Sequence, residues 1–110
     1  MDYKTARIFL LDQGKASDQN TDAFLIRLKS FKPPVPGQAT NILLALKMVF
    51  EDLQGHPHLD RELTYSLYQL AYESRRSFEA GRQSGVNWPP LLDEDLQRIA
   101  TAVKSIFAGV

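Results

Sequence analysis

The apolar positions of residues 59–85 recur every three or four residues and predict one long helix. At 100° per residue these positions fall on one side of a helix. They are Leu63, Leu67, Leu70, Ser74, Phe78, Gly81 and Gly85. Asp60 is expected to cap the first free amide groups, and Glu62 lies in the first turn. The predicted helix extends from Arg61 to Ser84, a length of roughly 36 Å.

The opposite side of this predicted helix combines aromatic and charged side chains. Its members are Arg61, Tyr65, Tyr68, Tyr72, Arg75, Arg76 and Glu79. Tyrosines beside arginines are typical of the centres of protein interfaces. Tyrosines covered by another helix of the same domain would give the same pattern, so the sequence leaves both interpretations open.

A first helix is predicted over Asp2–Gln13, followed by Gly14. Its apolar residues are Ala6, Ile8, Phe9, Leu10 and Leu11. Glycine suits the left-handed residue that often follows a helix. We therefore expect Gly14 to adopt a left-handed conformation.

A second, shorter helix is predicted to end at Lys29 and to bury Phe24, Leu25 and Leu28. Either Asp18 or Thr21 can cap it, and Thr21 is preferred because an acidic residue follows it. The next segment, KPPVPG at 32–37, has three prolines in four positions. Proline is excluded from helix interiors, so this segment is expected to be a stiff, extended connection.

The third predicted helix, from about Gln38 to Gln54, is apolar around more than half of its circumference. Its expected buried face comprises Ile42, Leu43, Leu46, Val49, Phe50 and Leu53. Leu44 and Met48 widen this face. Such breadth predicts burial on two sides.

The last predicted helix has Asp93 as its N-cap and ends at Gly109. Its apolar residues are Leu96, Ile99, Ala100, Val103, Ile106 and Phe107. Before it, Trp88 stands beside two prolines. We expect Trp88 to plug one end of the core, with its indole N–H bonded to a carbonyl. The alternative is a surface recognition residue.

These elements predict an all-α fold, a compact bundle of about five helices with a long fourth helix, in a single domain over residues 1–110. The breaks between helices are expected at Gly14–Asn20, Phe31–Gly37, Gly55–Leu59 and Val86–Leu92. No stretch alternates between apolar and polar residues as a half-buried strand does.

The amino-acid composition argues against several classes of function. Thirteen basic and thirteen acidic residues cancel, which argues against a general electrostatic grip on nucleic acid or on a membrane. The absence of cysteine excludes disulfides, thiolate metal sites and cysteine nucleophiles. The apolar run near the start is too short for a signal peptide. We therefore expect a cytoplasmic protein.

Three patterns suggest chemistry, and each has a simpler structural explanation. His56 and His58 precede Asp60 with metal-ligand spacing, but a turn before a capped helix explains them. The acidic run Asp93–Asp95 suits a helix start better than acid–base catalysis. The segment Gly14–Ser17 lacks the first glycine of a phosphate-binding loop. We expect no catalytic residue, cofactor or metal.

Four segments together resemble a family of short uncharacterised proteins from cyanobacteria. They are ILLALKMVFEDLQG, LDRELTYSLYQLAYESR, FEAGRQSGVNWPPLLDEDLQRIA and the closing AVKSIF, and the similarity extends from Asp2 to Phe107. The resemblance implies a cytoplasmic protein of photosynthetic bacteria without a known activity. Members carry a dethiobiotin synthetase label, but that enzyme class is a larger P-loop α/β protein, so the label is disfavoured for this chain.

The favoured function is a non-enzymatic helical interaction or regulatory module that self-associates, as a possible homodimer, or docks on a protein partner. The residues predicted to mediate this contact are Tyr65, Tyr68, Tyr72, Arg75, Arg76 and Trp88. The alternative is a small-molecule binder or enzyme with a cavity between the third and fourth helices. Such a cavity needs convergent polar groups, and the predicted inner faces offer few beyond Ser74 and Thr64.

Overall fold

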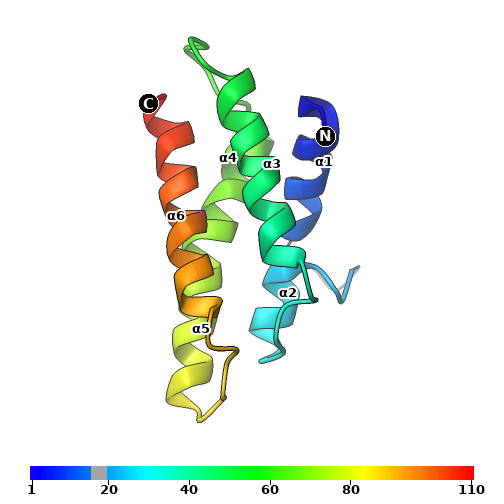
Figure 1. Cartoon of the computed structure of the whole chain (residues 1–110), viewed down its shortest axis with the longest axis vertical. Coiled ribbons are helices and arrows are strands. Elements are labelled where there is room, and N and C mark those ends of the chain that lie inside the picture. The colour runs from blue at the N-terminus through cyan, green and yellow to red at the C-terminus, as the bar shows by residue number, and fades with distance from the viewer. Residues whose placement is uncertain (16–19) are drawn as a thin grey trace.

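Helices make up nearly all of the regular structure in residues 1–15 and 20–110, the parts that the computed structural model describes (Figure 1). They are α1 (Tyr3–Gln13), α2 (Phe24–Lys29), α3 (Gln38–Asp52), α4 (Arg61–Tyr68), the π-helical turn η1 (Gln69–Glu73), α5 (Ser74–Gln83) and α6 (Leu92–Ala108). No strand occurs in these described ranges. The predicted all-α bundle is confirmed. So is its long fourth helix, because α4, η1 and α5 follow one another without a break.

The helices form four columns around one core. In Figure 1, α1 and then α2 descend on one side, α3 ascends, the column α4–η1–α5 descends behind it, and α6 ascends on the other side. Helix α1 packs against α3 and α4, and α6 packs against α3 and η1. Helix α2 packs against α5 and η1. Among the described residues, none of the helices is both long and apolar enough to cross a membrane.

The core stripe predicted for the long helix is buried, with one exception. Its buried members are Leu63, Leu67, Leu70, Ser74, Phe78 and Gly81. Gly85 is exposed, so the prediction was wrong for this residue. Its φ of 89° places it in the left-handed region that ends the helix, beyond the packed part of the column.

The long helix contains a π turn, which the sequence analysis did not predict. Residues Gln69–Glu73 form this turn between α4 and α5. Within this region the Ser74 hydroxyl donates a hydrogen bond to the Leu70 carbonyl oxygen. A π turn accommodates more residues than an α turn. The side chains after Glu73 are therefore rotated around the helix relative to a count at 100° per residue.

The start of α2 is capped from a distant part of the chain. The helix begins at Phe24, so Thr21 is not its N-cap and that prediction was wrong. The other predicted cap, Asp18, lies outside the described residues. The Phe24 amide donates instead to Gln13 Oε1 at 2.9 Å, and Gln38 Nε2 donates to the same oxygen at 2.7 Å. The Gln13 side chain therefore provides the hydrogen-bond acceptor for the first amide of α2, a role that a neighbouring side chain was expected to fill.

Glycine at position 14 is explained by close packing against α4, not by a left-handed backbone conformation. Its φ is −90°, so the predicted left-handed conformation was wrong. A Cβ atom at this position would lie 2.8 Å from the Ser66 carbonyl oxygen. Glycine therefore permits α1 to approach the backbone of α4 closely.

Two predictions for α3 and α6 need correction. Helix α6 begins at Leu92, and Asp93 lies within its first turn instead of capping it. Helix α3 packs against both α1 and α6, as its broad apolar face predicted, but Leu44 on this helix is exposed. Ala100 and Phe107 are also exposed on α6. Each of these apolar residues lies at the edge of a stripe, where periodicity alone does not define how far the neighbouring helices reach.

Candidate protein-interaction surface

The three tyrosines of the long helix lie at the surface. The exposed fractions are 61% for Tyr65, 42% for Tyr68 and 51% for Tyr72. Neighbouring helices cover the leucine side of the column instead, through contacts with α1, α2 and α6. Of the two arrangements that the sequence left open, the structure has the exposed one.

The tyrosine rings stack on one another along the helix. The centroids of Tyr65 and Tyr68 are 6.5 Å apart with an interplanar angle of 23°. Those of Tyr68 and Tyr72 are 5.2 Å apart at 21°. Because each ring shields a face of its neighbour, the row presents ring edges and hydroxyl groups to solvent.

Arg76 extends this row by one position. Its guanidinium carbon lies 5.9 Å from the centroid of the Tyr72 ring, within the range of a cation–π contact. Arg76 Nη1 also pairs with Glu73 Oε1 at 3.3 Å, although 64% of the Arg76 side chain is exposed. We call Tyr65, Tyr68, Tyr72 and Arg76 the tyrosine ladder.

The π turn keeps the tyrosine ladder on one side of the helix. In a uniform α-helix, residues four apart advance by 40°, so successive steps from 68 to 72 to 76 would drift around the axis. The π turn at Gln69–Glu73 has more residues per turn, so each residue advances by a smaller angle. This smaller angle compensates for the rotation that four α-helical residues would add between Tyr68 and Tyr72. π turns of this kind are found frequently at functional sites.

Partial desolvation changes the proton affinity of the central tyrosine. The crowding around Tyr68 raises its pKa above the usual 10.0, and the negative charge of Glu73 adds to the effect. Like any tyrosine hydroxyl, that of Tyr68 is protonated at neutral pH, and it can donate a hydrogen bond as well as accept one.

Arg75, predicted to share the tyrosine side, belongs to a different contact. Its Nη1 donates to Asp93 Oδ1 at 2.6 Å, and its Nη2 donates to the Asp93 carbonyl oxygen at 3.2 Å. Its guanidinium also lies 5.2 Å from the centroid of the Phe78 ring. The rotation introduced by the π turn carries Arg76 onto the ladder and directs Arg75 toward α6. Arg75 therefore ties α5 to the start of α6.

Trp88 packs within the chain, as the plug interpretation predicted. Its indole Nε1 donates to the Phe78 carbonyl oxygen at 2.9 Å. The two rings stack with centroids 5.8 Å apart. Trp88 therefore lies apart from the ladder, and its packing explains its position beside the prolines without a partner.

The ladder adjoins a shallow groove between α2 and α5 that the sequence analysis missed. Its lining includes Lys29, Phe31, Glu73, Arg76, Ser77 and Ala80. Phe31 is 43% exposed and has a φ of 60°, a left-handed conformation that is uncommon for a residue other than glycine. An aromatic residue directly before the proline-rich segment was the available signal, but periodicity does not indicate where such a side chain points.

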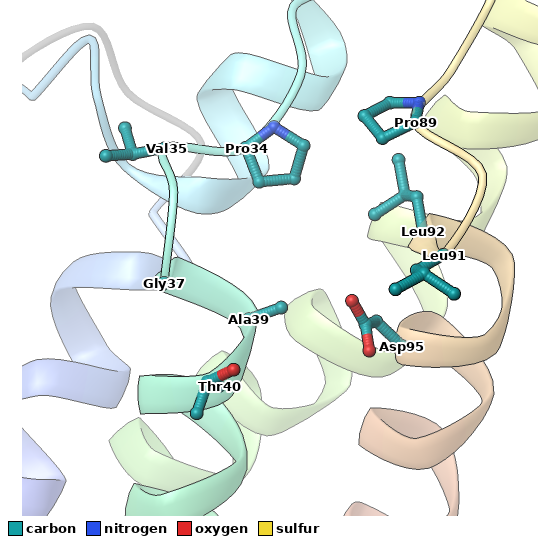
Figure 2. A pocket seen from close by; sticks show the side chains of 9 residues that line it. All are labelled: Pro34, Val35, Gly37, Ala39, Thr40, Pro89, Leu91, Leu92 and Asp95. Atoms are coloured by element: carbon teal, nitrogen blue, oxygen red, sulfur yellow. The ribbon is translucent and has the colours of Figure 1, made fainter.

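A small hollow lies where the two proline-rich connections approach each other. Figure 2 shows Pro34 from one connection and Pro89 from the other, with Leu91, Leu92 and Asp95 beside them. Its volume is about 160 Å³, smaller than the roughly 300–1,000 Å³ of typical ligand pockets. This hollow is too small to enclose a typical substrate or cofactor.

The buried polar groups do not converge on an open site. Within the described residues, no fully buried side-chain nitrogen or oxygen lacks a hydrogen-bond partner. The same ranges contain no cluster of three or more side chains suited to a metal ion. Asp60, one of the suggested metal ligands, accepts hydrogen bonds from the Leu63 amide and from Arg7.

No protein-family model, curated protein or solved structure matches this chain.

Proposed function

We propose that this chain is a non-enzymatic helical interaction module that docks on a protein, either itself or another, through the tyrosine ladder. The observation that carries the proposal is the exposure of three stacked tyrosines on one helix. Exposed aromatic patches are uncommon on monomers and usually mark a contact. Tyrosine suits a contact because its ring buries a large area while its hydroxyl still forms hydrogen bonds.

Protein is a better-supported partner than nucleic acid. Proteins that bind single-stranded nucleic acids stack bases on the faces of aromatic rings. In the ladder these faces are directed toward neighbouring rings, 5.2 and 6.5 Å away. Ring edges and hydroxyl groups instead suit the side chains of a protein surface.

A small-molecule site or enzyme between the third and fourth helices has less support. Helix α3 packs mainly against α1 and α6, and α4 packs mainly against α1, so these two helices do not frame a shared cleft. In the described part of the chain, the fully buried side-chain nitrogen and oxygen atoms already have hydrogen-bond partners, as the Gln13–Gln38 pair does. We also propose that the module acts in the cytoplasm of a cyanobacterial cell, in line with the sequence resemblance.

The direct test replaces Tyr68 and Tyr72 together by serine. Both side chains are exposed, so the double variant should melt close to the natural chain. Immobilised natural chain and variant are incubated with a lysate of the native cells, and the retained proteins are compared. We expect a protein retained by the natural chain to be lost with the variant.

Leu44→Ser is the control, because Leu44 is 55% exposed and lies on α3, a different helix from the ladder. This control should retain the same proteins as the natural chain. Equal retention by all three proteins would contradict the proposal. Unfolding of the double variant would show that the tyrosines serve the fold.

A further inference from the structure

We infer that the tyrosine ladder pairs with the same ladder of a second copy of this chain, with the two long helices antiparallel across a two-fold axis. This inference rests on the proposed function and specifies its partner. Two features of the ladder support it: the position of its midpoint and the distribution of charge.

The midpoint of the ladder defines an antiparallel register. Tyr68 and Tyr72 lie on either side of residue 70, within η1. A two-fold axis through this point sets Tyr68 opposite the partner's Tyr72. The same operation sets Tyr65 opposite the partner's Arg76, within one residue. A patch that maps onto itself in this way meets the requirement for a two-fold interface, the commonest symmetry of homo-oligomers.

The charges favour this direction over a parallel pairing. Arg61 and Arg76 are both exposed, near opposite ends of the ladder. A parallel pairing would bring each arginine against its own copy, and like charges repel. The antiparallel pairing sets Arg76 against a tyrosine ring, which attracts a guanidinium group. It also sets Arg61 opposite the partner's Glu79, one residue before the small, exposed Ala80.

The area of the ladder implies a weak dimer. Three tyrosines that are each about half exposed contribute roughly 300–400 Å² per copy. A standard interface buries about 800 Å² per partner. We therefore expect weak association with rapid exchange.

Sedimentation of the natural chain from 10 μM to 1 mM tests the association, with Arg76→Glu as the test variant. We expect the mean mass to rise with concentration, and Arg76→Glu to weaken dimerisation by about 3- to 30-fold. Arg98→Glu is the matched control. Arg98 is an exposed arginine on α6. It forms an ion pair with Asp95, three residues before it, as Arg76 does with Glu73. A constant monomer mass up to 1 mM, or equal effects of the two variants, would overturn the inference.

Cross-linking tests the direction of the pairing, because the chain has no cysteine of its own. Arg61→Cys and Ala80→Cys lie outside the ladder and can be joined by a short bis-maleimide. The antiparallel register predicts efficient cross-linking in a mixture of the two variants and little within either variant alone. Self-cross-linking of each variant, with little in the mixture, would overturn the register.

The two proposals fail separately. If the chain stays monomeric while Tyr68→Ser with Tyr72→Ser still loses a captured protein, only the second-copy inference fails. If neither association nor capture depends on the tyrosines, the proposed function fails as well.

Discussion

The indole nitrogen of Trp88 donates a hydrogen bond to the carbonyl oxygen of Phe78, 2.9 Å away, and the Trp88 ring covers Gly81 on the next turn of α5. This contact fastens the proline-rich connection between α5 and α6 to the end of the core. It also explains why glycine stands at position 81, because a Cβ there would lie 2.5 Å from Trp88 Cζ2.

Gly81→Ala is therefore expected to destabilise the protein. Overpacking a well-packed site costs about 1–3 kcal/mol, and the higher helix propensity of alanine returns up to about 1 kcal/mol. We expect a net loss of about 1–2 kcal/mol in the free energy of unfolding, measured by urea titration. In a Trp88→Ala background the clash is absent, so the same substitution should be neutral or stabilising. Equal losses in both backgrounds would mean that Trp88 does not constrain position 81.

Leu67→Ala tests the phase of the long helix. The Leu67 side chain is fully buried, so its truncation should lower the free energy of unfolding by roughly 2–5 kcal/mol. The control is Leu44→Ala on the exposed side of α3, with an expected effect within about 0.5 kcal/mol. A change below about 0.5 kcal/mol for Leu67→Ala would be inconsistent with this packing.

Asp60→Asn tests the link between α1 and the start of α4. Hydrogen bonds from Arg7 hold the pKa of Asp60 below its usual 3.8, and the Leu63 amide contributes to the same effect. A lowered folded-state pKa stabilises the protein above the unfolded-state pKa, and this stabilisation is lost as pH falls through the folded-state pKa. The natural chain should therefore lose stability more steeply below about pH 4 than Asp60→Asn does.

Asparagine retains the capping oxygen, so the comparison isolates the charge of Asp60. Urea titrations of both proteins between neutral pH and about pH 2.5 provide the measurement. Parallel stability curves over this range would show that the Arg7–Asp60 pair does not contribute to acid unfolding.

The protein is expected to bind neither nucleotide nor zinc. Both histidines before α4 are exposed, and Asp60 is engaged by Arg7 and by the helix start. Calorimetric titration with ATP–magnesium and, separately, with zinc should give no saturable heat. Stoichiometric binding of either at micromolar concentration would contradict the prediction and point to a site beyond the ladder.

The local features of the fold were predictable from the sequence because neighbouring residues determine them. The leucine stripe, the breaks at proline and glycine, and the Asp60 cap each depend on a few adjacent positions. The common side of Tyr65, Tyr68 and Tyr72 followed from their spacing of three and four residues. The indole hydrogen bond of Trp88 followed from the need of a packed N–H group for an acceptor.

The features that the sequence analysis missed depend on residues far apart in the chain. Gln13 accepts a hydrogen bond from the first amide of α2, Gln38 donates to the same Gln13 oxygen, and Gly14 is required by the approach of Ser66. Arg75 leaves the tyrosine side because a π turn rotates α5 toward Asp93. A count at a constant 100° per residue cannot include such a turn.

By itself, therefore, the sequence determined that this chain is helical, where its helices begin and end within a few residues, and that three tyrosines share one side of the longest helix. Only the tertiary structure decided that this side faces solvent and that Arg76, not Arg75, completes the row. The physical reason is that periodicity defines the faces of a helix, whereas the packing of distant helices defines which face is covered.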